Sequence, residues 1–506
     1  MCYVRNFTSE LVFKLSKWAL GTPPGNSIQR EQGVVMKPKK WLGVIAGVVA
    51  LGVGLTGCGG STNSSTSAST TSENGQVFVN GTDAPLASVV SFQVDITGMT
   101  VSDGVNPPIS VLNGTQTVDF ARLDGLHTLL DLNTIPAGSY TSVSMTFANP
   151  QIVYMNVTNP QTTPPTRPTI TTLNSTTSPA ASLTQSSATV NLTNPLTVSA
   201  SAVIGLAFDF DLKDSVAVDG SGNITGAVNP MVSIKAVTPS DADAYIDDYV
   251  AGVTSTATNS FTVQGPHGHT FTVNVTDQTE WENGETIANL TTSSIVEVSG
   301  TVDVTSGAIL ADTVAIVSQN SFWAGGLITY VDPSTTPASD FDMYVRSVLP
   351  SGTGFNSEQI STVNLTGNEK YFIYFWHNKF TNFLFNASLL VPGQHVSIAG
   401  PLNNGAVTVN RVVLRYEGHN GTWVAGSTNT GANTFQFNSN GVAGVLFNGP
   451  VTVYCTPFTN FKGGLTGLAS LTGSAAINIR VVGLVLKDPI SGQPVLVAHS
   501  VEHMTN

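Results

Sequence analysis

Apolar and polar positions alternate in short runs along most of the chain, a pattern typical of half-buried β-strands. Examples lie at residues 76–79 and 89–96, and similar runs continue to the end of the sequence. Long runs of helix-favouring residues at helical spacing are missing beyond residue 60. Thr and Val, which favour strands, and Gly, Asn and Ser, which favour turns, are abundant instead. The pattern therefore predicts an all-β protein.

The second half of the chain contains a pattern that recurs three times. A short apolar strand that ends in glycine lies at 295–300, 396–400 and 478–483, and each copy precedes a variable hairpin and another apolar strand. With 506 residues, the chain has room for roughly two to four domains. We expect three repeats of about six short strands each, at residues 249–318, 321–416 and 421–506.

An apolar run at residues 41–55 follows a cluster of three lysines and leads into Leu55-Thr56-Gly57-Cys58. A basic segment before an apolar segment of this length is typical of a secretory signal peptide rather than of a stable membrane span. The last four residues resemble the bacterial lipobox. This resemblance implies that the signal peptide ends before Cys58 and that the Cys58 thiol carries a diacylglyceryl group. The alternative is an uncleaved membrane anchor.

The same region bears on the start of the chain and on its location. Translation from Met36 would give a leader of normal length, and residues 1–35 would then be an upstream extension. We therefore assign residues 1–57 to an extension and a signal peptide, and the Ser/Thr-rich residues 58–74 to a flexible tether. Gly59 stands where an inner-membrane retention signal would have Asp. We expect a lipid-anchored protein of the cell envelope, at the outer membrane if the cell is Gram-negative.

Charge and cysteine content restrict the classes of partner. The part after Cys58 has 12 basic and 30 acidic residues, which gives a net charge of −18. Such a chain has no electrostatic attraction for nucleic acid, so we expect no nucleic-acid partner. Cys2 is lost with the leader and Cys58 carries the lipid, which leaves Cys455 without a disulfide partner.

Three motifs in the first half resemble one family. They lie at 79–85 (VNGTDAP), 135–141 (IPAGSYT) and 207–212 (AFDFDL). They resemble the bacterial lipoprotein family catalogued as domain of unknown function 4382, and residues 229–234 resemble its closing strand. The resemblance implies a β-sandwich at 75–238 and supplies no activity. We expect the Pro/Thr/Ser-rich stretch near 159–187 to be a disordered loop, and Asp83 to be a turn carboxylate that bonds its own backbone.

The first repeat resembles the module catalogued as domain of unknown function 5666. The matching segments are 252–253, 261–263, 271–273, 296–300 and 310–314. The other two repeats match more loosely and have longer insertions. The resemblance implies an N-terminal sandwich followed by three small antiparallel barrels similar to OB-folds. Such barrels can bind saccharides or nucleic acid, but the fold alone does not give a function.

Candidate sites are few. Asp209, Asp211 and Asp219 offer oxygens that Ca²⁺ could use, although a strand face and an ordinary hairpin turn are the favoured explanation. The aromatic segment 371–385 would present Tyr374 and Trp376 as a binding platform if it were exposed, but we favour a core strand pair of the middle barrel. We expect no metal, no cofactor and no catalytic nucleophile–base pair.

These observations lead to one hypothesis and one alternative. We hypothesise a non-catalytic, membrane-anchored lipoprotein with a binding or structural role in the cell envelope, and with a glycan or an envelope protein as its partner. The alternative is a carbohydrate-active accessory protein or an enzyme whose site the sequence does not reveal. A pocket with clustered carboxylates of perturbed pKa would favour the alternative. The sequence leaves the oligomeric state open.

Overall fold

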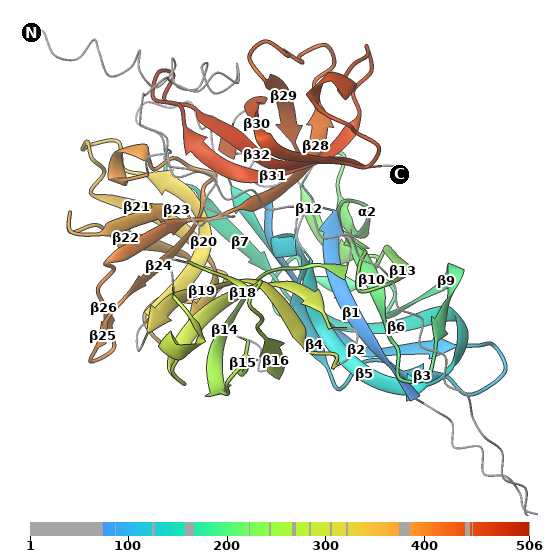
Figure 1. Cartoon of the computed structure of the whole chain (residues 1–506). Coiled ribbons are helices and arrows are strands. Elements are labelled where there is room, and N and C mark those ends of the chain that lie inside the picture. Colours follow the sequence, from blue (N-terminus) through green and yellow to red (C-terminus); the bar gives the residue numbers. More distant parts are fainter. Residues whose placement is uncertain are drawn as a thin grey trace, which may run out of the picture.

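The structure is a computed structural model that describes residues 74–504 except 85, 87, 124–126, 157–165, 222, 242–243, 266–269, 283–284, 304–305, 320–321, 374–384, 441–445 and 448. The expected fold class is confirmed, because a β-sandwich is followed by small barrel-like sheets (Figure 1). Helical elements within the described residues are at most four residues long.

The N-terminal sandwich consists of two main sheets. One has the strand order β13-β10-β1-β5, and the other has the order β3-β2-β6-β7, with β4 on β2 and β9 on β6. A small third sheet has the order β11-β12-β8. The bounds are β1 (Asn74–Ala84), β2 (Val89–Ser102), β3 (Ile109–Ser110), β4 (Gln116–Asp119), η1 (Phe120–Leu123), β5 (Thr128–Pro136), β6 (Gly138–Asn156), β7 (Thr169–Leu173), β8 (Ser182–Leu183), β9 (Ser187–Val198), β10 (Val203–Asp211), α2 (Leu212–Ser215), β11 (Val216–Val218), β12 (Ile224–Val228) and β13 (Val232–Val237).

Alternating side chains from the two main sheets form the sandwich core. On β2 the buried positions Phe92, Val94 and Ile96 share one face, as the period of a strand requires. Phe120 stacks on Phe210 of the opposite sheet, with ring centroids 4.9 Å apart, and Phe92 packs against the same ring in a tilted arrangement at 5.1 Å. Burying one such ring contributes roughly 1.5–3 kcal/mol. This aromatic cluster therefore holds the two sheets together.

Two of the sequence motifs meet in space. Strand β1 pairs in parallel with β10, and the register places Asp83 opposite Phe210. The Asp83 side chain is buried, and its Oδ1 accepts a hydrogen bond from the backbone N–H of Leu212 at 3.4 Å. The sequence suggested a turn at Asp83, but the residue lies within strand β1 and bonds the backbone of a distant segment. It ties the end of β1 to the start of α2.

The three following modules repeat one topology. In the first, the order is β16-β15-β14-β18-β19-β17, and a further pairing of β16 with β19 closes a five-stranded barrel. The second has the corresponding order β22-β21-β20-β24-β27-β23, and the third is the closed barrel β28-β29-β30-β32-β31. The bounds are β14 (Ile246–Thr256), β15 (Ser260–Gln264), β16 (Thr270–Asn274), β17 (Glu280–Trp281), η4 (Ile287–Asn289), β18 (Ser294–Val302), β19 (Ile309–Gln319); β20 (Phe322–Val331), β21 (Asp340–Leu349), β22 (Ile360–Asn364), β23 (Lys370–Ile373), η5 (Ala387–Leu389), β24 (His395–Gly400), β25 (Leu402–Asn403), β26 (Ala406–Val407), β27 (Arg411–Leu414); β28 (Glu417–Trp423), β29 (Thr434–Ser439), β30 (Val451–Lys462), η6 (Leu468–Ser470), β31 (Asn478–Lys487) and β32 (Pro494–His503).

The sequence suggested purely antiparallel barrels, but the barrels also contain parallel strand pairs. The pairs β16–β19, β17–β19, β23–β27 and β30–β32 are parallel. The reason is geometric: if five strands alternate in direction around a closed barrel, the closing pair must run the same way. In the third module one long strand, β30, makes both parallel contacts, on either side of an irregularity between Cys455 and Asn460.

The repeated glycine of the three apolar strands has a structural cause. A Cβ at Gly300 would overlap the carbonyl oxygen of Leu310, and the same holds for Gly400 with Thr408 and for Gly483 with Val497. The neighbouring backbone therefore approaches too closely for any side chain. Gly300 and Gly483 also adjoin register shifts in their ladders. The motif marks a point where two strands of each barrel approach each other closely.

The prediction of a disordered loop near 159–187 is wrong for the part that the structure describes. Residues 169–173 form β7, which pairs with the far half of β6, and β8 pairs with β12. Leu173 and Ala181 are buried in the sandwich core. Thr-rich composition suits an edge strand as well as a disordered segment, and the long β6 supplies the partner that orders it. Residues 159–165 lie outside the described residues.

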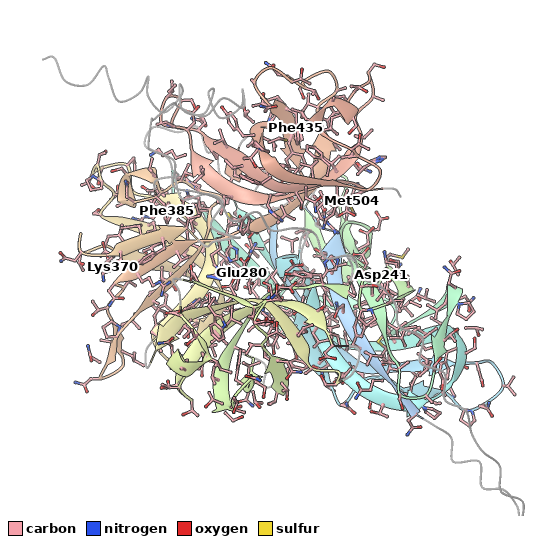
Figure 2. The ribbon with its side chains drawn as sticks, in the orientation of Figure 1. Asp241, Glu280, Lys370, Phe385, Phe435 and Met504 are labelled. Carbon is pink, nitrogen blue, oxygen red and sulfur yellow. The ribbon has the colours of Figure 1, made fainter. Side chains whose placement is uncertain are left out.

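The modules share their apolar cores. Phe78 and Leu129 of the sandwich belong to one buried cluster with Tyr249 and Val298 of the first module. A second cluster joins the first and second modules to Leu484 and other residues of the third. In Figure 1 the third module lies above the other modules, and the first module lies between the second module on the left and the sandwich on the right. Figure 2 shows side chains filling each module, with the fully buried Phe435 inside the third.

Candidate functional site

Charged side chains concentrate where the modules meet. Six arginines follow Cys58 in the sequence: Arg122, Arg167, Arg346, Arg411, Arg415 and Arg480. Each of the first five has a polar partner in a different module or in a neighbouring connection, and Arg480 bonds Asn420 at 3.2 Å within the third module. In this acidic chain, five of the six arginines after Cys58 thus make contacts that join different parts of the chain.

The second and third modules meet at a buried ion pair. Arg346 of β21 donates to both carboxylate oxygens of Glu417 on β28, at 2.9 and 2.7 Å. His395 of β24 lies 3.1 Å from the same carboxylate and also contacts the carbonyl oxygen of Tyr416 at 2.8 Å. Burial alone would raise the pKa of Glu417, but Arg346 and His395 hold it well below its usual value. Glu417 is therefore ionised.

A second histidine of this junction, His419, is uncharged. His419 lies two residues from Glu417 on β28, is 1% exposed, and packs against the ring of Phe447. Its Nε2 has no hydrogen-bond partner among the described residues. Burial lowers the pKa of His419 to about 4, although the nearby Glu417 carboxylate opposes this shift. The junction thus contains an imidazole that is neutral at ordinary pH.

Two further pairs fix the first module to the second. Arg415, in the connection between β27 and β28, forms a fully buried ion pair with Glu297 of β18, and its Nη1 donates to Ser397 at 3.2 Å. Arg411 of β27 lies 3.5 Å from Glu282, which follows β17. Buried pairs of this kind define a specific arrangement more than they add net stability.

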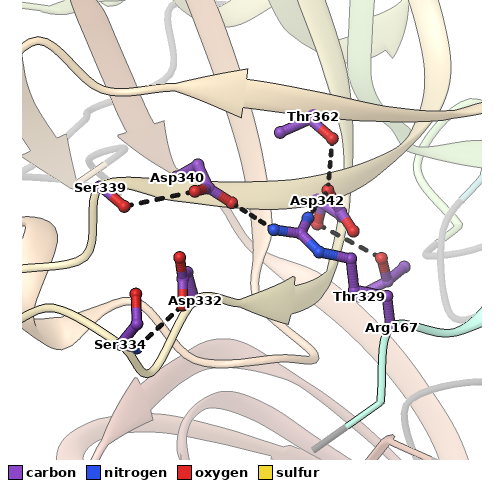
Figure 3. Close-up of polar contacts among 8 residues, drawn as sticks. All are labelled: Arg167, Thr329, Asp332, Ser334, Ser339, Asp340, Asp342 and Thr362. Carbon is purple, nitrogen blue, oxygen red and sulfur yellow. Dashed lines mark hydrogen bonds and ion pairs between the residues drawn. The ribbon is translucent and has the colours of Figure 1, made fainter.

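The sandwich is connected to the second module by Arg167. This residue precedes β7 and donates to Asp340 at 2.7 Å and to Asp342 at 2.5 Å, both on β21 (Figure 3). Its guanidinium also lies 4.4 Å above the ring of Tyr330. Thr362 of β22 donates to Asp342 from the other side at 2.7 Å. The Arg167 side chain remains 43% exposed, so this contact is a clamp at the surface rather than a buried ion pair.

A cleft lies between the sandwich and the first module. Its lining comes from β4, η1, β5 and β14, and includes Asp119, Arg122, Thr128, Tyr249 and Gly265. Asp119 is 6% exposed and accepts a hydrogen bond from the backbone N–H of Phe92 at 2.9 Å. Burial raises the pKa of Asp119, and the Phe92 bond and Arg122 only partly counteract it. Burial also raises the pKa of Tyr249, whose hydroxyl contacts the backbone of Gly265.

Arg122 differs from the other arginines. Its Nη1 donates to the Ser347 hydroxyl of the second module at 3.3 Å, and none of the ion pairs found among the described residues includes it. Burial lowers the pKa of Arg122, and the Asp119 carboxylate offsets only part of this shift. The guanidinium nevertheless stays charged. The cleft therefore contains a cation that pairs directly with no carboxylate of the described residues.

The weak calcium candidates do not converge. Asp209 lies on β10, and burial raises its pKa. Asp211 caps α2 by accepting from the backbone N–H of Asp214, and Asp219 accepts from the backbone of Ser221 and Asn223 in a hairpin turn. Across the described part of the chain, no group of three His, Cys, Asp or Glu side chains could hold a metal ion.

Other predicted sites lie outside the described residues. These are Cys58 and the aromatic platform of Tyr374 and Trp376, so both stay predictions. Within the ranges that the structure covers, we find no helix with the length and apolar character needed to cross a membrane.

Comparison with known proteins identifies the class of the first domain. Residues 74–225 match the family described as "Domain of unknown function (DUF4382)", which supports the family assignment of the sandwich. No curated protein matches the chain. Among solved structures, the chain titled "drosophila Unr CSD456" aligns with 51% of this chain and 97% of its own length, with 9% identity and a TM-score of 0.13. A TM-score this low carries no argument about fold or function.

Little in the sequence indicated that charged residues would meet at the junctions between modules. Arg346, Glu417 and His395 are separated by more than twenty residues from one another, and each looks like an ordinary polar residue of a strand. One signal was present: arginines are rare after Cys58, and most of them lie within or beside apolar strands. A charged residue at a buried strand position usually has a charged partner.

Proposed function

We propose that this chain is an exported lipoprotein that is held to the cell envelope by lipid on Cys58 and has a non-catalytic, structural or binding role. The observation that carries the proposal is the set of charged pairs that connect all four β-modules. Independent catalytic or carrier domains do not need charged pairs that join them to their neighbours. In a rigid multi-module body such pairs help to define one arrangement of the modules, because a buried pair is satisfied only when both partners are in place.

The position of the body relative to the membrane fits this role. Two acyl chains anchor a protein stably where one would not. The part after Cys58 has a net charge of −18, which opposes close contact with anionic headgroups. We infer that the lipid supplies the attachment and that the β-modules extend away from the surface, where a glycan or an envelope protein is the expected partner.

The alternative, a carbohydrate-active enzyme, receives less support from the described residues. Glycoside hydrolysis ordinarily needs two carboxyl groups that face each other across the scissile bond. The described lining of the cleft between the sandwich and the first module contains one carboxylate, Asp119. That carboxylate is committed to the backbone N–H of Phe92. We therefore favour a binding site over a hydrolytic one at this position.

The anchor is tested by Cys58→Ala in cells that are supplied with a palmitate analogue. We expect the variant to leave the membrane fraction and to lose the label. Cys455→Ala is the matched control, because Cys455 is a partly buried thiol of the third module, and this variant should remain labelled and membrane-bound. Label that persists in Cys58→Ala would contradict the lipoprotein assignment.

The role is tested by pelleting the purified protein with isolated cell-wall sacculi and by cross-linking in intact cells. Retention on sacculi, or one reproducible envelope cross-link, is the expected result. Hydrolysis of the sacculi by the purified protein would contradict the non-catalytic assignment.

A further inference from the structure

We propose that the cleft between the sandwich and the first module is a binding site for a small organic carboxylate, with the Arg122 guanidinium as the group that recognises it. This inference does not rest on the lipid anchor. It rests on the geometry of the cleft and on how the other arginines of the chain are used.

The first step is the pattern of arginine pairing. Arg167, Arg346, Arg411, Arg415 and Arg480 each form an ion pair with a carboxylate of the chain. Arg122 forms none among the described residues, and its one direct partner is a neutral hydroxyl, that of Ser347. A buried or half-buried cation normally acquires an anionic partner, because burial without one is costly. No carboxylate of the described residues pairs with Arg122 directly, so the carboxylate of a ligand can take that position.

The second step is the position of Arg122. It lies on η1 and lines the cleft together with β5 and β14, so the guanidinium faces a recess between two modules. Ser347 engages Nη1, which fixes one end of the guanidinium group. A planar guanidinium presents parallel N–H donors that match the two oxygens of a carboxylate. The fixed fork thus favours a carboxylate over a neutral ligand.

The third step concerns the remaining walls. Leu123, Leu129 and Val250 give the cleft apolar sides, whereas Thr128 and Tyr249 add hydroxyl groups. A few polar groups within apolar walls are typical of sites for small organic molecules. An inorganic ion would leave the apolar walls in contact with water. We therefore assign the ligand as an organic carboxylate with a body of only a few carbon atoms, because the cleft has a volume of about 60 Å³.

Asp119 shapes the selectivity of this site. Its carboxylate also lines the cleft, but its hydrogen bond to the N–H of Phe92 directs it to the backbone of β2. It lowers the positive potential around Arg122 without pairing with it directly. A ligand carboxylate therefore has to compete with a nearby negative charge, and we expect Asp119→Asn to strengthen binding of an anion by severalfold.

The experiment is calorimetric titration of the purified protein with propionate and with lactate, each compared with inorganic phosphate. We expect at least one of the two carboxylates to bind and phosphate to bind at least tenfold more weakly. Arg122→Gln should weaken carboxylate binding at least tenfold. Arg480→Gln is the matched control, since it removes one arginine charge from the third module and should change the affinity less than twofold.

Three outcomes would overturn the proposal. They are the absence of binding of either carboxylate at millimolar concentration, binding of phosphate alone, and carboxylate binding that Arg122→Gln leaves intact. Should Arg122→Gln fail to fold, Arg122→Lys keeps the charge and loses the fork, so it should weaken binding at least threefold. The Asp119→Asn variant is a second, independent measure, and an unchanged or weaker affinity there would also count against the site.

Discussion

Arg346 of the second module and Glu417 of the third form a two-pronged ion pair in which both side chains are more than nine-tenths buried. The two residues belong to different barrels, so the pair exists only while those barrels are docked. Because the modules also share apolar clusters, we expect the whole described body to unfold as one cooperative unit rather than module by module.

The strength of this junction can be measured by removing one partner. Arg346→Met should lower the free energy of unfolding by about 3–5 kcal/mol, because it leaves the Glu417 carboxylate buried without its cation. Urea unfolding, followed by both fluorescence and circular dichroism, would give the change. The two signals should stay coincident in the native protein.

A double variant separates the loss of the ion pair from the cost of leaving one charge buried without its partner. In Arg346→Met/Glu417→Leu no unpaired charge is left, so we expect the double variant to be more stable than Arg346→Met alone. If the two single losses simply add, the residues are not coupled and the proposed docking role is wrong.

The repeated glycines allow a sharper test of the barrel geometry. Gly400→Ala should cost about 1–3 kcal/mol, because the new Cβ would overlap the carbonyl oxygen of Thr408. Gly252→Ala is the control: its Cβ would lie 3.9 Å from the Gln264 oxygen, which is an ordinary contact. Thermal unfolding compares the two, and equal melting temperatures would contradict the steric explanation.

The glycines also illustrate what the sequence could predict. The repeat was visible because a close approach of two strands at the same place in three barrels requires glycine there. Local alternation of apolar and polar residues identified the strands. The sequence did not reveal the parallel strand pair that closes a barrel, because that pairing depends on how many strands the barrel has. Order at β7 was missed for a similar reason, since a Thr-rich segment becomes a strand only when β6 extends far enough to pair with it.

The site was harder to predict than the fold. Asp119 and Tyr249 line one cleft although they lie in different domains, and only docking brings them together. Periodicity in the sequence describes which face of a strand is buried, but not which module buries it. The charged junctions and the cleft are consequences of that docking.

The buried His419 predicts a pH dependence of stability. Burial lowers its pKa in the folded protein from 6.5 to about 4. The unfolded chain therefore binds an extra proton between these values, and the contribution of His419 to stability is complete above pH 6.5 and is lost as the pH falls toward 4. This loss amounts to about 3 kcal/mol. Glu417, whose pKa is lowered, adds a separate loss below pH 4.5.

Comparison of two histidine variants isolates this effect. His419→Phe should flatten the dependence of unfolding free energy on pH between 6.5 and 4, because no group then has to be protonated on unfolding at that position. His503→Gln, at the partly exposed end of β32, should leave the slope unchanged. Parallel slopes for His419→Phe and the native protein would exclude His419 as the source.

The Arg167 clamp predicts a local rather than a global effect. Because its side chain is 43% exposed, Arg167→Ala should change the free energy of unfolding by less than about 1 kcal/mol. The loss of the contacts with Asp340 and Asp342 should instead free the start of β7, so its backbone amides should exchange with deuterium faster. Arg167→Lys keeps the charge but not the two-pronged geometry or the stacking on Tyr330, and should give an intermediate rate.

Lys213→Ala removes an exposed charge from the same domain and should leave the exchange rate of β7 unchanged. Faster exchange throughout the sandwich, rather than at β7, would mean that Arg167 supports the whole domain and is not a clamp.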